Sequence, residues 1–272
     1  MEHVTIIAEA GVNHNGDINL AHQLIDVGAD AGADVIKFQT WKTELLVTPD
    51  AVMAEYQVAN TGERESQFAM LKRLELSYEQ FHELKLHCDT RGIEFMSTPD
   101  EEESAAFLNS IVSRFKIGSG ELTNHPFLRY VAGLGKPIIL STGMGTLEEV
   151  AAAVMVIERV GLARDQLTLL HATTDYPANM EDVNLIAILT MHEAFGLDVG
   201  YSDHTEGIHV PLAAVALGAT LIEKHVTLDR SMTGPDHRAS LEPKELAQMV
   251  QSIRQIERAM GDGVKRPSPA EL

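Results

Sequence analysis

Eight short apolar runs recur along this 272-residue chain, and each is followed by a segment whose apolar residues have helical spacing. Short runs rich in β-branched residues are typical of strands buried on both faces of a parallel sheet. Eight such strands, alternating with helices in a chain of this length, predict an α/β protein with the (β/α)8 TIM barrel fold. The runs comprise residues 4–8, 35–39, 93–96, 114–117, 137–140, 167–170, 197–200 and 219–222.

A doubly wound open sheet is the alternative for alternating strands and helices. Such a sheet usually carries a Gly-rich phosphate motif after its first strand, and residues 11–16 (GVNHNG) do not fit the pattern G-x-G-x-x-G. We therefore expect one barrel domain over residues 1–261 and a linker-like tail over residues 262–272. Residues 41–76 interrupt the strand–helix rhythm, and so long an insert is usually functional, as a lid or a substrate wall.

The composition limits the partners and the compartment. The chain holds 40 Asp and Glu against 21 Lys and Arg, a net charge of -19, and so acidic a surface repels nucleic acid and anionic membranes. No apolar segment approaches the ~20 residues of a transmembrane helix, and the first residues lack a signal-peptide pattern. The one cysteine, Cys88, excludes an internal disulfide and a cysteine-based zinc cluster. We expect a cytoplasmic protein.

Nearly every apolar run ends in polar or ionisable residues. In (β/α)8 barrels the carboxyl ends of the strands form one mouth, and the active site lies there. A mouth lined with polar groups is costly unless ligands satisfy them, so the pattern favours an enzyme that acts on a small molecule. The residues concerned are Glu9, Lys37, Gln39, Ser97, Thr98, Lys116, Ser119, Glu121, Ser141, Thr142, Thr174, Tyr176, Ser202, His204, Glu223 and His225.

His204 and His225 follow the seventh and the eighth run. If these strands are neighbours in a parallel sheet, the two imidazoles lie side by side at the same end, which suits one divalent metal ion. Two protein ligands would leave positions open for water and substrate oxygens, as Lewis-acid activation of a carbonyl requires. The alternative is a pair of unrelated histidines at strand ends.

Lys37 and Lys116 lie within strands and point into the predicted mouth. Together with serine hydroxyls and backbone N–H groups, they could bind a phosphate or a carboxylate. Alternatively, each lysine only pairs with a carboxylate at a strand end.

Glu9 and Glu121 are candidates for general acid or base catalysis, or for ion pairing alone. Two more polar residues, in loops, are either site residues or plain surface: Tyr176 and Asp236.

Sequence motifs accompany these strand ends. They comprise residues 7–16 (IAEAGVNHNG), 37–40 (KFQT), 97–99 (STP), 115–121 (FKIGSGE), 140–144 (LSTGM), 200–205 (GYSDHT) and 234–240 (GPDHRAS). Together they resemble the motifs of the sialic acid synthase family, which includes N-acetylneuraminate, legionaminate and pseudaminate synthases. The resemblance covers essentially the whole chain.

The resemblance implies a barrel that condenses phosphoenolpyruvate with an N-acetylmannosamine-type aldose and water, giving a nine-carbon sialic-acid-like 2-keto acid and phosphate. It implies that His204 and His225 bind Mn2+ or Mg2+, which holds the sugar aldehyde oxygen. The residues implied to be catalytic are Glu9, Glu121 and Lys116. Those implied to hold phosphoenolpyruvate are Lys37, Lys116, Ser119, Ser141 and Ser202. Those implied to contact the sugar are Gln39, Glu121, Tyr176 and Asp236. We also expect substrate contacts from Thr98 and Thr174.

Members of this family usually continue into a small antifreeze-like domain, through which the partner subunit of a swapped dimer supplies an arginine to the sugar. A homodimer is therefore expected. Thr174 stands where some members have Asn, so the resemblance leaves the acceptor sugar open. Two other functions remain. One is a condensation like that of the arabinose- or erythrose-phosphate synthases, although no clear extra arginine cluster is present for a sugar phosphate. The other is a catalytically weak barrel that binds a sugar acid.

Overall fold

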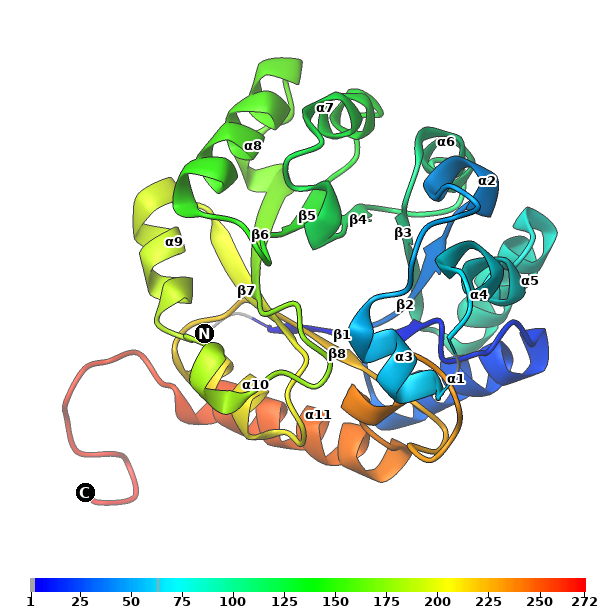
Figure 1. Ribbon diagram of the computed structural model, residues 1–272. Coiled ribbons are helices and arrows are strands. Elements are labelled where there is room, and N and C mark those ends of the chain that lie inside the picture. The colour runs from blue at the N-terminus through cyan, green and yellow to red at the C-terminus, as the bar shows by residue number, and fades with distance from the viewer. Residues whose placement is uncertain (1–2, 63) are drawn as a thin grey trace.

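The computed structural model describes residues 3–62 and 64–272, so residues 1, 2 and 63 of the predicted barrel domain lie outside the described residues. Eight parallel strands form one sheet in the order β3-β2-β1-β8-β7-β6-β5-β4, and β3 and β4 also lie next to each other. The sheet therefore closes into a barrel inside a ring of helices (Figure 1), which confirms the predicted TIM barrel. The strands are β1 (Thr5–Gly11), β2 (Val35–Thr40), β3 (Glu94–Pro99), β4 (Phe115–Ile117), β5 (Ile138–Ser141), β6 (Leu167–Ala172), β7 (Asp198–Asp203) and β8 (Leu221–His225).

Each strand leads into at least one α-helix. The α-helices are α1 (Ile18–Ala31), α2 (Thr43–Leu46), α3 (Glu55–Thr61), α4 (Gln67–Leu74), α5 (Tyr78–Arg91), α6 (Glu102–Leu108), α7 (His125–Gly133), α8 (Leu147–Val160), α9 (Ala187–Phe195), α10 (His209–Ala216) and α11 (Pro243–Ala259). Short 3-10 helices occur at η1 (Ser119–Glu121), η2 (Arg164–Gln166), η3 (Met180–Asp182) and η4 (His237–Ala239).

The helices begin where capping residues satisfy the free N–H groups of the first turn. The Asp17 side chain caps α1, and Ser77 and Thr146 form capping boxes at the starts of α5 and α8. Asn124 caps α7. Glu101 accepts hydrogen bonds at the start of α6, and two further acidic residues lie in its first turn, where they interact favourably with the helix dipole.

Side chains of the strands alternate between the interior of the barrel and the surrounding helices. In β2, for example, Ile36 and Phe38 pack outward in the main core. A separate interior cluster consists of Ile7, Val35, Met96, Ile139, Leu170 and Leu221. Two positions further along five of these strands, the inward residues are Glu9, Lys37, Thr98, Ser141 and Glu223. The barrel interior is therefore apolar toward the amino ends of the strands and polar at their carboxyl ends.

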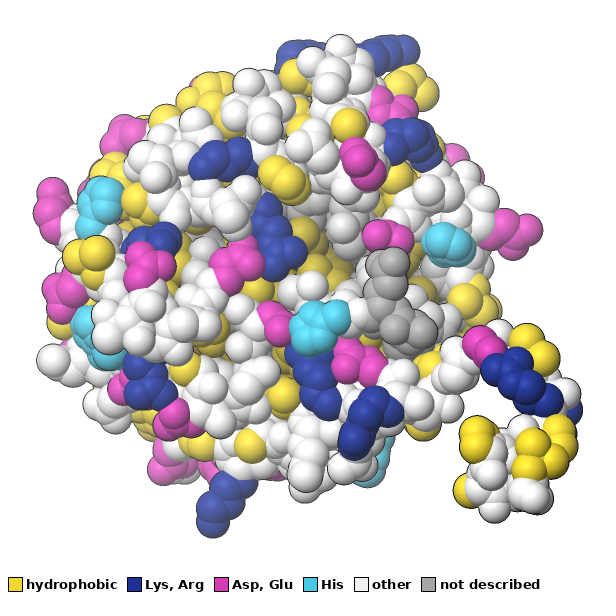
Figure 2. Space-filling view, turned by 180° about the vertical axis from the view of Figure 1, so that it is seen from behind, with side chains coloured by type: hydrophobic (Ala, Val, Ile, Leu, Met, Phe, Trp, Pro, Cys, Tyr) yellow, Lys and Arg dark blue, Asp and Glu magenta, His cyan; other side chains and the backbone are white. Residues whose placement is uncertain are grey.

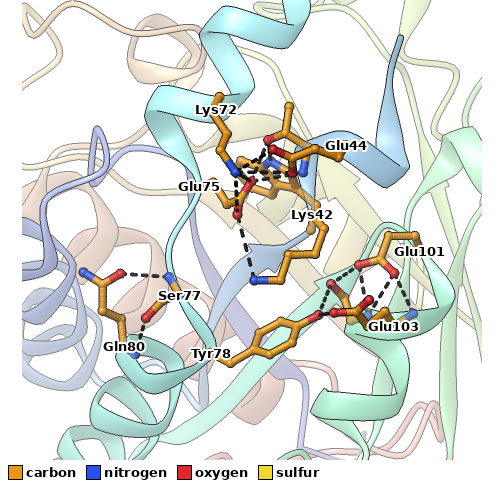
Figure 3. Close-up of polar contacts among 12 residues, drawn as sticks. Lys42, Glu44, Lys72, Glu75, Ser77, Tyr78, Gln80, Glu101 and Glu103 are labelled. Carbon is orange, nitrogen blue, oxygen red and sulfur yellow. Dashed lines mark hydrogen bonds and ion pairs between the residues drawn. The ribbon is translucent and has the colours of Figure 1, made fainter. Parts of the chain in front are cut away.

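The insert after β2 contains α2, α3 and α4 and has a small core of its own. Ion pairs connect α2 with the end of α4: Lys72 on α4 lies 3.0 Å from Glu44 on α2 and 3.2 Å from Glu75 (Figure 3). The Lys42 ammonium lies 4.0 Å from the centre of the Tyr78 ring in the same group. The core consists of Val12, Trp41, Met53, Met70 and Leu74.

Helix α3 of the insert contacts two loops beside the mouth. The Asn60 amide donates to the carbonyl of Pro235 at 2.6 Å and to that of Tyr176 at 3.4 Å. Arg238 donates to the Asn60 side-chain oxygen at 3.4 Å. The insert therefore lies over one side of the mouth, whereas its role as a lid stays a prediction.

Several elements differ in their bounds from the expected ones. Strands β3, β6 and β7 run two or three residues further toward the mouth, because the polar residues after each apolar run continue the parallel pairing. Helix α9 begins at Ala187, because η3 and a turn separate it from β6. Cys88 is buried in α5.

The surface mixes charges of both signs. Figure 2 shows the face opposite to that of Figure 1, where basic and acidic side chains are interspersed. Residues 261–272 are exposed throughout and project from the barrel (Figure 1). Among the helices of the described part of the chain, none has both the length and the apolarity to cross a bilayer.

Candidate active site

A cavity of about 180 Å³ opens at the carboxyl ends of the strands. All residues with a predicted catalytic, substrate-binding or metal-binding role line it except Glu121 and Asp236, whereas Ser97 and Thr142, also expected at the mouth, do not line it. Asp100 and Glu223, for which no ligand-binding role was predicted, line it as well. The complete lining is Glu9, Lys37, Gln39, Thr98, Asp100, Lys116, Gly118, Ser119, Gly120, Ser141, Thr174, Tyr176, Ser202, His204, Glu223 and His225.

Four buried charges of alternating sign form the floor of the cavity. The Lys37 ammonium lies 2.8 Å from the Glu9 carboxylate and 3.7 Å from that of Glu223. Lys116 lies 3.2 Å from the other oxygen of Glu223. Lys37 also donates to the Thr98 hydroxyl at 3.0 Å. Both lysines are thus paired with strand-end carboxylates, and both ammonium groups remain at the cavity, where an anion could bind them.

Burial favours the neutral form of each of these four groups, and neighbouring charges decide the outcome. Burial raises the pKa of Glu9 to about 7, although Lys37 attracts its charged form. For Glu223, burial is outweighed by Lys116 and Lys37, which lower its pKa to about 2. Burial lowers the pKa of Lys116. Two carboxyl groups with different proton affinities therefore lie side by side, and only Glu9 can hold a proton near neutral pH.

Hydroxyl groups line the side of the cavity formed by the ends of β4, β5 and β6. The Ser119 hydroxyl donates to that of Ser141 at 3.0 Å and accepts from the Gly143 N–H at 3.0 Å. The Thr174 hydroxyl oxygen is buried without a hydrogen-bond partner within the described residues. A Cβ at Gly143 would lie 2.3 Å from that oxygen and 2.8 Å from the Ser119 hydroxyl oxygen, so a larger residue there would displace these hydroxyls. This wall can donate several hydrogen bonds to a bound anion.

His204 and His225 lie side by side, with ring centres 5.5 Å apart, because β7 and β8 are neighbours in the sheet. The Nδ1 atom of His204 lies 2.6 Å from the Thr173 carbonyl, which only accepts, so Nδ1 carries the proton and Nε2 presents a lone pair. The Nδ1 atom of His225 is buried and has no hydrogen-bond partner in the described chain, with an Asp236 oxygen at 3.9 Å.

The two histidines fit a divalent metal ion. Burial lowers the pKa of His204 to about 4 and that of His225 well below its ordinary value, so both rings are neutral, as metal ligands must be. The Thr173 carbonyl fixes the tautomer of His204 in the way that outer-shell partners do. Between residues 3 and 272, apart from residue 63, no three His, Cys, Asp or Glu side chains are grouped closely enough to hold an ion alone. Water or substrate oxygens would complete the coordination.

The remaining predicted residues surround these two centres. The ring centres of Tyr176 and His204 are 4.1 Å apart. Gln39 donates to the Glu9 carboxylate at 3.2 Å, and the Ser202 hydroxyl donates to Glu223 at 2.9 Å. These contacts orient both carboxylates of the floor.

Glu121 lies on η1 at the rim, where its carboxylate accepts a hydrogen bond from Asn124 at 2.6 Å. Asp100, which the sequence pattern left out of the site, directly follows β3, and burial raises its pKa to about 7. Glu223, expected at the mouth, precedes His225 by two residues in β8, so strand alternation places the two side chains on the same face.

Comparison with known proteins agrees with this arrangement. Residues 24–265 match the NeuB family. The chain is 53% identical over 272 residues to N,N'-diacetyllegionaminic acid synthase of Campylobacter jejuni, a match that covers 100% of this chain and 81% of the relative. It is 50% identical over 270 residues to the protein of the same name from Legionella pneumophila, covering 98% and 76% of the two chains.

The crystal structure of an N-acetylneuraminic acid synthetase from Leptospira borgpetersenii in complex with citrate matches with a TM-score of 0.87 at 37% identity. That match covers 99% of this chain and 89% of the other. The shared barrel thus includes all strands that carry the cavity. The chain belongs to the NeuB family.

Proposed function

We propose that this protein condenses phosphoenolpyruvate with an N-acylated amino sugar and water, giving a nine-carbon 2-keto acid of the sialic acid type and phosphate. One observation carries the proposal: the mouth combines two buried lysines, a wall of hydroxyls and two neutral histidines. The same chain is 53% identical over its whole length to an N,N'-diacetyllegionaminic acid synthase.

The donor would bind at Lys37 and Lys116. Phosphoenolpyruvate carries a phosphate and a carboxylate, and these ammonium groups are the buried cations at the cavity. Hydroxyls of Ser119, Ser141 and Ser202 would add hydrogen bonds. An incoming anion also meets the carboxyl of Glu9, and the raised pKa of that group allows it to hold a proton, which reduces the repulsion.

The acceptor sugar would occupy the side of the cavity formed by Tyr176, Gln39 and the two histidines, with Asp236 behind His225. Mn2+ or Mg2+, held by His204 and His225, would polarise the aldehyde of the open-chain sugar. The Tyr176 ring lies against that of His204, tilted by 39°, and would keep bulk water from this side of the pocket.

The reaction balances without another reactant. The enol carbon of phosphoenolpyruvate forms a bond to the aldehyde carbon, water adds at C2, and phosphate leaves as the C2–O bond breaks. Glu9 would exchange the protons near the reacting carbons, because its pKa of about 7 is close to the pH at which it must both accept and donate. Lys116 would stabilise negative charge on the donor, and Glu121, at the rim, would contact the sugar.

The acceptor sugar is characterised by the number of its N-acetyl groups. The names of the two relatives specify two N-acetyl groups on the product. We therefore expect an acceptor with two acetamido groups to react faster than N-acetylmannosamine, which has one.

A sugar panel tests the proposal. Purified protein with phosphoenolpyruvate is given a diacetamido sugar, N-acetylmannosamine or arabinose 5-phosphate, with and without Mn2+, and released phosphate is measured. The proposal expects metal-dependent release with the amino sugars. Release with arabinose 5-phosphate alone would instead support a sugar-phosphate condensation. Binding of the amino sugars and phosphoenolpyruvate without any release would support a sugar-acid-binding barrel.

A further inference from the structure

A fully buried ion pair lies directly behind the two histidines. Asp203, at the end of β7, and Lys224, in β8, are both completely buried, and their charged atoms are 2.6 Å apart. Neither residue lines the cavity. Both point outward from the barrel wall, because successive side chains of a strand face opposite sides and the cavity is lined by their neighbours. The proposed reaction does not involve this ion pair.

The pair is part of a dense hydrogen-bond network. The Asp203 carboxylate accepts from the backbone N–H of Thr205 at 3.1 Å, from the Thr205 hydroxyl at 2.9 Å and from the Tyr201 hydroxyl at 3.2 Å. The Lys224 ammonium also donates to the carbonyl of Thr205. The residues before and after His204 are therefore both bound to Lys224.

The register of the sheet connects this network to the histidines. Asp203 and Lys224 are direct partners in the β7–β8 ladder. His204 follows Asp203 and His225 follows Lys224, so each member of the ion pair is covalently next to one histidine. A change in the spacing of the outward pair would therefore change the spacing of the two imidazoles on the inward side.

We propose that the Asp203–Lys224 pair is a positioning device that fixes His204 and His225 at the separation needed to share one divalent metal ion. This inference rests on the proposed function, because it presupposes that the two histidines bind a metal. Thr205 belongs to the same device, since its backbone and hydroxyl hold the chain on the far side of His204.

The competing explanation is that the pair only stabilises the fold. Buried ion pairs are poor at this task, because the desolvation of two charges offsets their attraction, and apolar replacements of both partners are often neutral or stabilising. The two explanations therefore differ in a measurable way. If the pair only stabilises the fold, replacing both partners should lower stability and leave metal binding unchanged. If the pair sets the histidine geometry, the replacement should weaken metal binding with little change in stability.

The test uses the double variant Asp203→Asn with Lys224→Met, which removes both charges and keeps the side-chain volumes similar. Asn at position 203 can still accept the hydrogen bonds from Thr205. The matched control is Asp89→Asn with Lys85→Met, which removes the same residue types from an exposed pair on α5. Mn2+ binding in the absence of substrates is measured by calorimetry and by electron paramagnetic resonance, and urea denaturation reports stability.

The double variant should bind Mn2+ about 10-fold more weakly than wild type, the usual loss when an outer-shell partner is removed, and the control should not change. The resonance signal of any bound Mn2+ should show altered coordination. If the double variant does not fold, Thr205→Val supplies the same test, because it removes one hydroxyl bond to Asp203 at nearly constant shape.

Equal Mn2+ affinity in wild type and in the folded double variant would overturn the positioning role and leave the proposed function intact. Absence of Mn2+ binding by wild type would overturn the two-histidine metal site and this inference with it. Phosphoenolpyruvate affinity should be the same in all of these proteins. If the double variant lost phosphoenolpyruvate affinity as much as Mn2+ affinity, the substitutions would have damaged the whole mouth, which would also contradict the inference.

Discussion

Replacing Lys116 by methionine tests the proposed anion site. Methionine keeps most of the volume and the apolar stem of lysine and removes the charge together with the hydrogen-bond donors of the ammonium group. The Lys116 ammonium lies 3.2 Å from Glu223, a distance at which two unit charges attract by about 5 kcal/mol at an effective dielectric constant of about 20. After the change, Glu223 still has Lys37 at 3.7 Å. We therefore expect a stability loss at the lower end of the roughly 3–5 kcal/mol typical of a broken buried pair.

The effect on the donor should be larger than the effect on the sugar. A hydrogen bond to a charged group contributes about 1.5–3 kcal/mol, so the variant should bind phosphoenolpyruvate about 10- to 100-fold more weakly. Calorimetric titration with phosphoenolpyruvate measures this change, and the sugar KM at saturating phosphoenolpyruvate should stay close to that of wild type. Urea denaturation shows whether the variant is folded under the assay conditions.

The control is Lys265→Met, which removes the same charge from an exposed position in the C-terminal tail. It should leave phosphoenolpyruvate affinity unchanged, because exposed charges on the surface are screened. Unchanged phosphoenolpyruvate affinity in a folded Lys116→Met protein would show that the donor does not bind at the buried lysines.

Four further substitutions probe other parts of the site. Gly143→Ala should weaken phosphoenolpyruvate binding by about 10-fold or more, because the new Cβ would lie 2.3 Å from the Thr174 hydroxyl; calorimetry measures it. Burial raises the pKa of Glu9 from 4.5 to about 7, so the folded wild-type protein loses stability as pH rises through this range and Glu9 must ionise. Glu9→Gln has no such group and should therefore gain stability relative to wild type over the same range. Urea denaturation at about pH 5 and about pH 8 measures the change. His204→Ala and His225→Ala should each abolish turnover while circular dichroism shows an intact fold.

Each of these has a contrary result. Wild-type donor affinity in Gly143→Ala would exclude the hydroxyl wall from the anion site. A stability difference between Glu9→Gln and wild type that stays constant with pH would mean that Glu9 titrates at its ordinary pKa. Full activity of chelator-treated His225→Ala would rule out the metal site.

The barrel and most of its mouth could be predicted from the sequence, because a strand in a parallel sheet has a simple pattern. Val35 and Lys37 are two residues apart, so the inward face of β2 changes from apolar to charged in a way that the sequence alone displays. The same periodicity placed His204 and His225 at one end of the barrel. Their adjacency followed from the strand count, and the rings are indeed 5.5 Å apart.

The partners of the charged residues could not be predicted, because the sequence does not specify distances between strands. Three carboxylates were possible partners for the lysines, and the structure pairs Lys37 with Glu9 and Lys116 with Glu223, whereas Glu121 turns to Asn124. Asp100 was missed although it follows the inward-facing Thr98 by two residues, so strand alternation could have placed it at the cavity.

The most direct test of the proposed function is phosphate release from phosphoenolpyruvate with an amino sugar, with and without Mn2+, in wild type and in His204→Ala. We expect release in the wild type with Mn2+, together with a nine-carbon 2-keto acid in equal amount by mass spectrometry, and no release in the variant. Equal release in both proteins, or release without any new carbon–carbon bond, would contradict it.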